Sequence, residues 1–263
     1  MSSLTVTLIQ TNLHWENKKA NLEMLQRKIE SIKEKTEVVI LPEMFTTGFS
    51  MKPEIFAEKI DGETVRWMKK IAAERKIILT GSVMIEEAGK FFNRLIWMLP
   101  NGEYGVYDKR HLFAFADENS HYTAGNKKLI ASVKGWKINL QVCYDLRFPV
   151  WTRQSPGKDE NKYDLIINVA NWPDKRSLAW KTLLQARAIE NQCFVVGVNR
   201  VGKDGEKIFY NGDSSIIDPL GEMIYQKSND EDIFTYTLQK EKISETRSQF
   251  PFWRDADSFL INE

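Results

Sequence analysis

The chain has 263 residues, of which 42% are hydrophobic, so it is long enough and apolar enough to bury a substantial core. Its 37 Lys and Arg residues nearly balance 36 Asp and Glu residues, which gives a formal net charge of +1. A nucleic-acid-binding protein needs a concentrated basic face, and the mixed charges along this chain exclude that class of partner.

The start of the chain and its metal-binding residue types exclude further classes. Residues 3–9 lack a basic start and are too short for a secretory signal, and no apolar run approaches a membrane span. The two cysteines form no CxxC pair. The three histidines are too scattered for a recognisable zinc site: His14, His111 and His121. We therefore expect no metal, no cofactor, no membrane partner and a cytoplasmic setting, where a free thiol survives.

The first half of the chain alternates apolar runs with amphipathic stretches. It predicts a strand at 4–9, a helix at 17–35, a short buried strand at 38–41 and a helix over Glu63–Arg75. Strands at 77–83, 93–99 and 103–108 follow, the last two joined by the turn signal Asn101-Gly102.

The second half predicts strands at 128–133, 137–142 and 164–169, then a helix over Ser177–Asn191 capped by Ser177. A strand at Phe194–Asn199, a hairpin of 214–218 with 223–226 and a strand at 233–238 complete the series. Residues 248–263 show no clear period and could pack on the body or on a partner subunit. The whole predicts one layered α/β domain over residues 1–263, with mixed sheets and outer helices.

Cys143 is the strongest candidate for chemistry. It ends the strand at 137–142 and a polar turn follows at once, which is how a rigid strand presents a nucleophile. A helix beginning there would favour the thiolate through its N-terminal dipole. Cys193 lies between a helix and an apolar strand, which indicates core packing.

A cysteine nucleophile needs a base, donors for the oxyanion and an acid for the leaving group. No histidine follows His121, which excludes the order of papain-like enzymes, and no G-x-S-x-G elbow occurs. Glu43 and Lys109, like Cys143, each sit at the C-terminal end of a predicted strand. Each alone is more simply a solvated surface residue. In a layered α/β fold, however, such strand ends converge on one crevice, so we expect the three to meet.

Two further residues have ambiguous settings. Glu118 lies in the polar loop 116–120, which by itself is typical of a solvated acidic loop. Trp172 follows the strand at 164–169 and could line a pocket or plug the core.

These residues and their neighbours resemble the nitrilase superfamily of carbon–nitrogen hydrolases. Three ordered segments carry the resemblance, and two more look like family segments: 41–45 (LPEMF), 107–113 (YDKRHLF) and 142–149 (VCYDLRFP), with 168–173 (NVANWP) and 185–191 (QARAIEN). The resemblance spans nearly the whole chain and implies a four-layer α-β-β-α sandwich.

The resemblance also implies roles. Glu43 becomes the general base and acid, Lys109 the oxyanion and orienting group, and Cys143 the nucleophile. The family's second glutamate best matches Glu118, although Asp117 lies beside it. Members usually pair subunits across helices near the nucleophile. This implies a homodimer or higher homo-oligomer that buries residues 150–154 and part of Ser177–Asn191.

The activity implied is that of an omega-amidase, which cleaves the terminal amide of 2-oxoglutaramate and related dicarboxylate monoamides and releases ammonia. Such a substrate needs pocket walls and a cation for its carboxylate. The expected substrate-binding residues are Phe113, Tyr144, Arg147, Asn171 and Trp172. Phe115 is a further candidate wall, and the spacing leaves Lys175 and Arg176 open as alternative cations.

Three rival interpretations remain at the level of sequence. The chain could belong to another branch of the family, acting on a nitrile, a carbamoyl amide or a short aliphatic amide. It could be a binding protein that keeps the fold without turnover, although a binder has no need of a thiol. A redox thiol protein is disfavoured because no resolving cysteine lies near Cys143.

Overall fold

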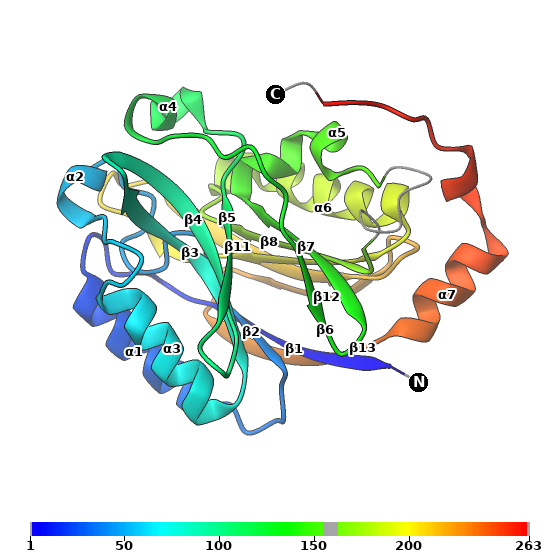
Figure 1. Cartoon of the computed structure of the whole chain (residues 1–263), viewed down its shortest axis with the longest axis horizontal. Helices are drawn as coiled ribbons and strands as arrows, with labels where there is room; N and C mark the ends of the chain where they lie inside the picture. Colours follow the sequence, from blue (N-terminus) through cyan, green and yellow to red (C-terminus); the bar gives the residue numbers. More distant parts are fainter. Residues whose placement is uncertain (1, 155–162, 262–263) are drawn as a thin grey trace.

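Two mixed β-sheets pack face to face, with helices on their outer sides (Figure 1), in a computed structural model that describes residues 2–154 and 163–261. The first sheet has the strand order β13-β1-β2-β3-β4-β5. Its strands are β13 (Asp232–Gln239), β1 (Ser3–Gln10), β2 (Val38–Ile40), β3 (Ile78–Glu87), β4 (Lys90–Met98) and β5 (Tyr104–Asp108).

The second sheet has the order β10-β11-β9-β8-β7-β6, with β12 paired to β11. Its strands are β10 (Val201–Lys203), β11 (Phe209–Ile217), β9 (Phe194–Asn199), β8 (Leu165–Ala170), β7 (Trp136–Val142), β6 (Ile130–Val133) and β12 (Met223–Ser228). Strands β7, β8 and β9 run parallel, whereas β6 and β11 pair antiparallel with their neighbours. The predicted mixed sheets are confirmed.

The helices form the two outer layers. Helices α1 and α3 pack together on the first sheet, and α6 packs on β9 and β11 of the second (Figure 1). The helices are α1 (Lys18–Glu30), α2 (Pro53–Phe56), α3 (Glu63–Arg75), α4 (Glu118–His121), α5 (Pro149–Thr152), α6 (Ser177–Asn191) and α7 (Lys240–Gln249). The four-layer α-β-β-α sandwich is therefore confirmed.

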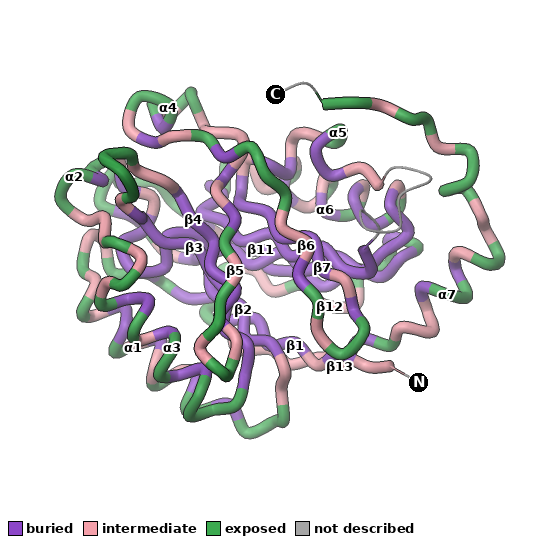
Figure 2. Tube along the Cα trace, in the orientation of Figure 1, coloured by how far each residue is buried: buried purple, intermediate pink, exposed green. Residues whose placement is uncertain are grey.

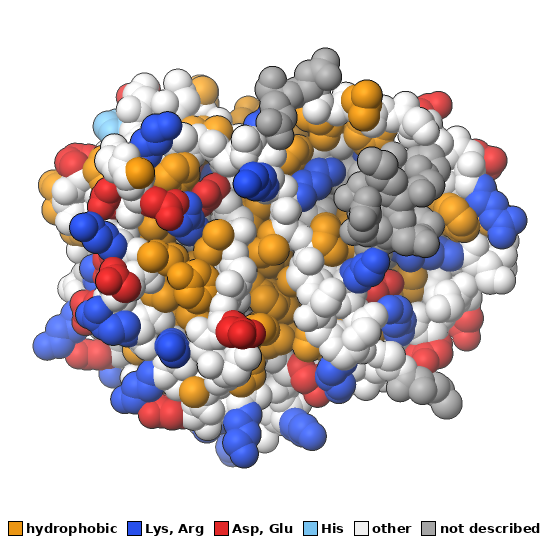
Figure 3. Space-filling model, viewed as in Figure 1, with side chains coloured by type: hydrophobic (Ala, Val, Ile, Leu, Met, Phe, Trp, Pro, Cys, Tyr) orange, Lys and Arg blue, Asp and Glu red, His pale blue; other side chains and the backbone are white. Residues whose placement is uncertain are grey.

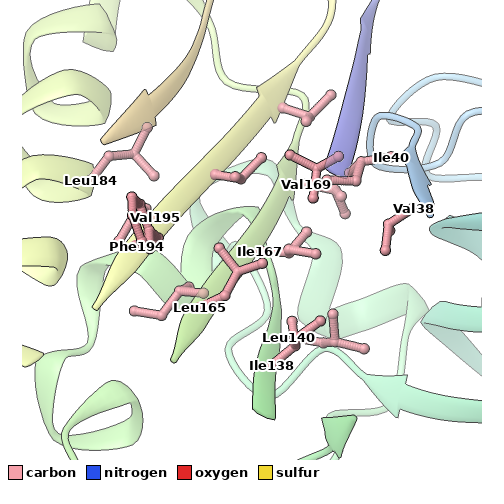
Figure 4. Close-up of a cluster of buried hydrophobic side chains, with 14 of the residues drawn as sticks. Val38, Ile40, Ile138, Leu140, Leu165, Ile167, Val169, Leu184, Phe194 and Val195 are labelled. Carbon is pink, nitrogen blue, oxygen red and sulfur yellow. The ribbon is translucent and has the colours of Figure 1, made fainter. Parts of the chain in front are cut away.

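Alternation along β2 shows how the sequence builds these layers. Val38 and Ile40 join the core between the two sheets, together with Ile138 and Leu140 of β7 (Figure 4). Residues Val39 and Leu41 instead join the core under α1 and α3. Successive strand side chains point to opposite faces, so a short run that is buried throughout serves two cores. The strands at the centre are buried along most of their length (Figure 2).

An apolar groove lies between the edge strands β5 and β6, lined by Trp97, Leu99, Tyr104, Leu129 and Ala131, among others. Hydrophobic side chains gather on this face of the molecule, with charged residues around them (Figure 3). Apolar side chains from both sheets are thus accessible in this groove.

Two local predictions are wrong at the ends of helices, and one helix was not predicted. Helix α1 ends at Glu30 rather than at 35, because the chain turns at Ser31, although Ile32 still packs into the core. Ser177 is the first residue of α6 rather than its cap, and its hydroxyl donates to the Asp213 carboxylate at 2.5 Å. The sequence also missed α7, whose only buried residues are Ile243 and Thr246, so it lacks a wide apolar stripe.

The C-terminal segment predicted without a period is described up to residue 261. It contains the end of α7 and a 3-10 turn at Phe252–Asp255, in which no residue is buried. Residues 262 and 263 of that prediction lie outside the described residues. None of the described helices combines the length and the apolarity needed to cross a bilayer.

Candidate active site

Three strand ends deliver the predicted trio to one place. Glu43 follows β2 after two residues, Lys109 comes directly after β5, and Cys143 comes directly after β7. Glu43 and Lys109 have no exposed surface, and Cys143 is 8% exposed. The interpretation of Glu43 and Lys109 as solvated surface residues is therefore wrong.

Lys109 lies between two carboxylates. Its Nζ is 2.9 Å from Glu43 Oε1 and 2.8 Å from Glu118 Oε2. Burial alone would lower the pKa of Lys109, but Glu118 and Glu43 raise it above its ordinary value. The lysine is therefore a fixed ammonium whose position is set by two acids.

Glu118 starts α4 and is fully buried, which rules out the solvated loop. Besides Lys109, its carboxylate accepts the backbone N–H of Phe113 at 2.6 Å. Burial raises the pKa of Glu118, and Lys109 opposes that shift. The neighbouring Asp117 points to solvent and accepts from the Ser120 hydroxyl, so of the two acids only Glu118 reaches the lysine.

Sequence reasoning missed Asn93, which joins the two carboxylates. Its Nδ2 donates to Glu43 Oε1 at 2.8 Å and to Glu118 Oε1 at 3.2 Å. Its backbone carbonyl accepts the backbone N–H of Lys109. The signal available was a lone asparagine inside the apolar run of β4, because a buried amide needs partners.

Gly125 closes the loop that carries Glu118 back onto Lys109. Its N–H donates to the Lys109 carbonyl at 3.0 Å. A Cβ at this position would lie 2.2 Å from the Asp108 carbonyl oxygen, so only glycine permits this approach.

Asn171 holds Glu43 from the opposite sheet. Its backbone N–H donates to Glu43 Oε2 at 2.7 Å, and its Nδ2 donates to the Glu43 carbonyl at 2.6 Å. One Glu43 oxygen thus faces Lys109 and Asn93 while the other faces the loop after β8. The carboxylate is oriented by groups from both sheets.

Cys143 opens a tight turn, as predicted. Its φ is +46°, a left-handed conformation that is rare outside glycine, and the 3-10 turn Cys143–Arg147 begins at this residue. The sequence predicted that a helix dipole would favour the thiolate, but the pKa of Cys143 is shifted the other way. Burial raises the pKa of Cys143 well above its ordinary value, and the Glu43 carboxylate raises it further while Lys109 lowers it. The thiol is therefore protonated at rest and needs a base.

A pocket opens beside this thiol. All five predicted substrate-binding residues line it: Phe113, Tyr144, Arg147, Asn171 and Trp172. The remaining lining residues besides Cys143 are Phe49, Ala116, Pro173, Arg176, Ile208 and Tyr210. Of these six, the sequence singled out Arg176 as an alternative cation and placed Pro173 in the segment 168–173. The other four gave no signal, because loops far apart in the chain bring them together.

Two arginines contribute the positive charge of the pocket. The Arg147 guanidinium lies 4.9 Å from the Trp172 ring centre, and that of Arg176 lies 5.0 Å from the Phe113 ring centre. Within residues 2–154 and 163–261, neither guanidinium pairs with a carboxylate. Two other candidates do not line the pocket: Phe115, which is 86% exposed, and Lys175, which is exposed.

No set of three or more His, Cys, Asp and Glu side chains in the described parts of the chain is placed to hold a metal ion. The chemistry that the described side chains themselves offer is nucleophilic attack. A protonated thiol beside a carboxylate and a fixed ammonium suits attack on an acyl carbon.

The fold and this arrangement define a carbon–nitrogen hydrolase. The carbon-nitrogen hydrolase family model matches residues 5–248, and the chain belongs to that family.

Two relatives and one solved structure are similar to this chain over nearly its whole length. The chain is 44% identical to the omega-amidase YafV of Escherichia coli over 262 residues, which is 99% of this chain and all of the relative. It is 31% identical to the 2-oxoglutaramate amidase of Bacillus subtilis, over 95% of this chain and 96% of that protein. A crystal structure from Xanthomonas campestris, a CN-hydrolase superfamily protein with an arsenic adduct in its active site, is 44% identical, covers both chains fully and gives a TM-score of 0.96.

Proposed function

We propose that this protein is an omega-amidase. It hydrolyses the terminal amide of 2-oxoglutaramate and similar dicarboxylate monoamides to the acid and ammonia, through a thioester on Cys143. Full-length likeness to an omega-amidase and to a 2-oxoglutaramate amidase supports the activity and the substrate class. The observation that carries the chemistry is the Lys109 ammonium, held between Glu43 and Glu118 beside the thiol.

The first half-reaction forms the thioester. Glu43 takes the Cys143 proton while the sulfur attacks the amide carbon, and the carbonyl oxygen becomes an oxyanion. The Lys109 ammonium and the backbone N–H of Tyr144 stabilise that charge, an effect of about 3 kcal/mol per donor. As the carbon–nitrogen bond breaks, Glu43 gives its proton to the nitrogen and ammonia leaves.

The second half-reaction releases the acid. Water attacks the thioester carbon and Glu43 accepts one of its protons, which regenerates an oxyanion facing the same donors. The carbon–sulfur bond then breaks, and the sulfur recovers the proton from Glu43. Glu118 touches Lys109 and holds the ammonium in place, and it positions the substrate amide and the water.

The pocket suits a substrate that carries a carboxylate. Phe113 and Trp172 form apolar walls, and Arg147 and Arg176, each stacked on one of these rings, face the pocket without a carboxylate partner among the described residues. A guanidinium without an acid partner is suited to bind the substrate carboxylate. Arg147 is the predicted ligand, and Arg176 lies on the same pocket.

The proposal also covers the extent of the domain, the location of the protein and its oligomeric state. A single domain over residues 1–263 and a cytoplasmic location fit the sequence. A homodimer or higher homo-oligomer would cover exposed apolar side chains on α5 and α6, namely Val150 (55% exposed), Leu178 (78%) and Ile189 (52%).

The alternative is another activity of the same family: a nitrilase, a carbamoyl-amide hydrolase or a different small-amide hydrolase. Purified protein is incubated with 2-oxoglutaramate, with its analogue succinamic acid, with a neutral amide of similar length and with a carbamoyl compound. Ammonia and carbon dioxide are then measured. We expect ammonia alone, fastest from 2-oxoglutaramate. Faster turnover of the neutral amide, or carbon dioxide from the carbamoyl compound, contradicts the omega-amidase proposal.

A further inference from the structure

The carboxylate of Asp145 binds both strand ends that carry Lys109 and Cys143. Asp145 lies in the turn after β7 and has no exposed surface. Its Oδ1 accepts the backbone N–H of His111 at 3.0 Å and lies 2.8 Å from His111 Nδ1. Its Oδ2 accepts the Tyr107 hydroxyl at 2.8 Å and the Val142 N–H at 3.1 Å. One buried carboxylate thus accepts four hydrogen bonds from three residues on two strand ends.

These hydrogen-bonded residues lie within two positions of Lys109 and Cys143 along the chain. Tyr107 and His111 lie two residues before and two residues after Lys109. Val142 directly precedes Cys143, and Asp145 follows it by two residues. The residues on both sides of Lys109 and the residue before Cys143 therefore donate to the same carboxylate.

Surrounding groups hold this carboxylate and its donors in place. Trp151 Nε1 donates to the Tyr107 oxygen at 3.0 Å, and the His111 ring stacks on Phe148 with 3.7 Å between ring centres. Burial and the Asp145 carboxylate hold the pKa of Tyr107 well above its ordinary value, so its phenol keeps its proton and donates. A carboxylate accepts only, so His111 Nδ1 carries a proton as well.

The turn itself needs such support. Cys143 is held at a φ of +46°, a conformation that costs a non-glycine residue of order 1–3 kcal/mol and persists only where neighbouring contacts fix it. The bond from Val142 N–H to Asp145 closes the turn across Cys143, and Arg187 Nη2 donates to the Leu146 carbonyl at 2.6 Å. The carboxylate of Asp145 is the part of this support that also reaches β5.

We propose that Asp145 is a positioning residue, whose carboxylate fixes the spacing between the Lys109 ammonium and the Cys143 thiol. The inference rests on the function proposed above for those two groups. Asp145 does not line the pocket, and it acts on the reaction only through the two strand ends that it joins. A misplacement of about 1 Å at a reacting group costs on the order of 100-fold in rate, so a small relaxation of this link is measurable.

The central variant is Asp145→Asn, which keeps the shape of the side chain. Whichever way the amide lies, its NH2 group replaces one oxygen, and two of the four donors lose their acceptor. We expect kcat to fall on the order of 100-fold, with KM within about threefold of its original value, because the pocket walls are untouched. Alkylation of Cys143 by iodoacetamide should slow by roughly tenfold.

Asp164→Asn is the matched control. Asp164 is also buried and binds the other end of β7, where it accepts the Lys137 N–H at 2.9 Å. That end of the strand lies away from Cys143. This variant should lose stability and keep both kcat and the alkylation rate. If kcat of Asp145→Asn stays within about threefold of the Asp164→Asn value, Asp145 has a structural role only and the proposal is overturned.

A milder variant decides the matter if Asp145→Asn does not fold, as judged by circular dichroism. Tyr107→Phe removes one of the four donors and leaves the ring in place, and we expect a drop in kcat of about tenfold with KM unchanged. An unchanged kcat would contradict the proposal. If the wild-type protein cleaves none of the amides tested, the alkylation rates still compare the variants, so failure of the proposed activity is distinguishable from failure of this inference.

Discussion

The two cysteines of this chain are both buried, but their surroundings differ. Cys143 is 8% exposed and Cys193 is fully buried, and burial raises the pKa of both thiols. Cys143, however, opens onto a pocket and sits in a left-handed turn beside Glu43 and Lys109. Cys193 precedes β9 within the hydrophobic core and lines none of the pockets described. The two thiols thus differ in access and in charged neighbours, although burial raises the pKa of both.

The largest expected effect separates the two thiols by mutation. Cys143→Ala removes the nucleophile, and we expect turnover of 2-oxoglutaramate to fall by a factor on the order of 10⁵ or more. Cys193→Ala should keep kcat close to that of the wild type. Ammonia release by both variants is the measurement, with circular dichroism to show that each is folded. Retained turnover in Cys143→Ala would sink the thioester mechanism.

The next effect tests the base that distinguishes Cys143. Glu43→Gln cannot accept the thiol proton, and we expect kcat to fall by on the order of 10³-fold, the range of general-base catalysis. Glu37→Gln, a half-buried glutamate that binds the Thr5 N–H at 2.7 Å, is the control and should leave kcat unchanged. Equal kcat in Glu43→Gln and in the wild type would show that another group takes the proton.

A third test compares the reactivity of the thiols without any substrate. Iodoacetamide should label Cys143 roughly tenfold or more faster than Cys193 in the native protein, because only Cys143 meets a pocket and a base. Mass spectrometry of peptides over time gives both rates. In denaturant the two rates should converge. Equally slow labelling of the native thiols would favour a binding protein that keeps this fold without turnover.

The smallest expected effect is on the stability of the protein and concerns Cys193 alone. The Cys193 side chain packs in the hydrophobic core, and no hydrogen bond to its sulfur is seen within the described residues. Because only this packing is lost, Cys193→Ala should lower the free energy of unfolding by about 1 kcal/mol. Urea unfolding measures this change. A loss of activity at low urea in this variant, with the fold intact, would indicate that Cys193 acts on the site after all.

Much of the site was predictable from strand ends. Glu43, Lys109 and Cys143 each follow an apolar run, and the layered fold brings such ends together, as the structure shows. The mixed sheets, the outer helices and the strand Phe194–Asn199 also agree with the pattern of the sequence. These features depend on local periodicity and on signatures that lie within a few residues of each other.

What the sequence did not predict depends on contacts between distant segments. Asn93 resembles any polar residue in a strand until the fold places Glu43 and Glu118 on its amide. Helix α7 buries only two residues, so its sequence shows no helical period of apolar residues. The thiolate expected at Cys143 fails for the same reason. Burial and the Glu43 carboxylate, which no local pattern reveals, raise the pKa of the thiol, although Lys109 lowers it.

The paired bonds between Asn171 and Glu43 join residues 128 positions apart and connect the two sheets. Neither sheet alone contains the site, because Glu43 and Lys109 follow strands of one sheet and Cys143 follows a strand of the other. Contacts of such sequence separation form late in folding, after local helices and hairpins. During refolding, hydrolytic activity should therefore recover only when the two sheets have docked, and later than the far-ultraviolet signal of secondary structure. The active site thus serves as a built-in reporter of the final assembly step.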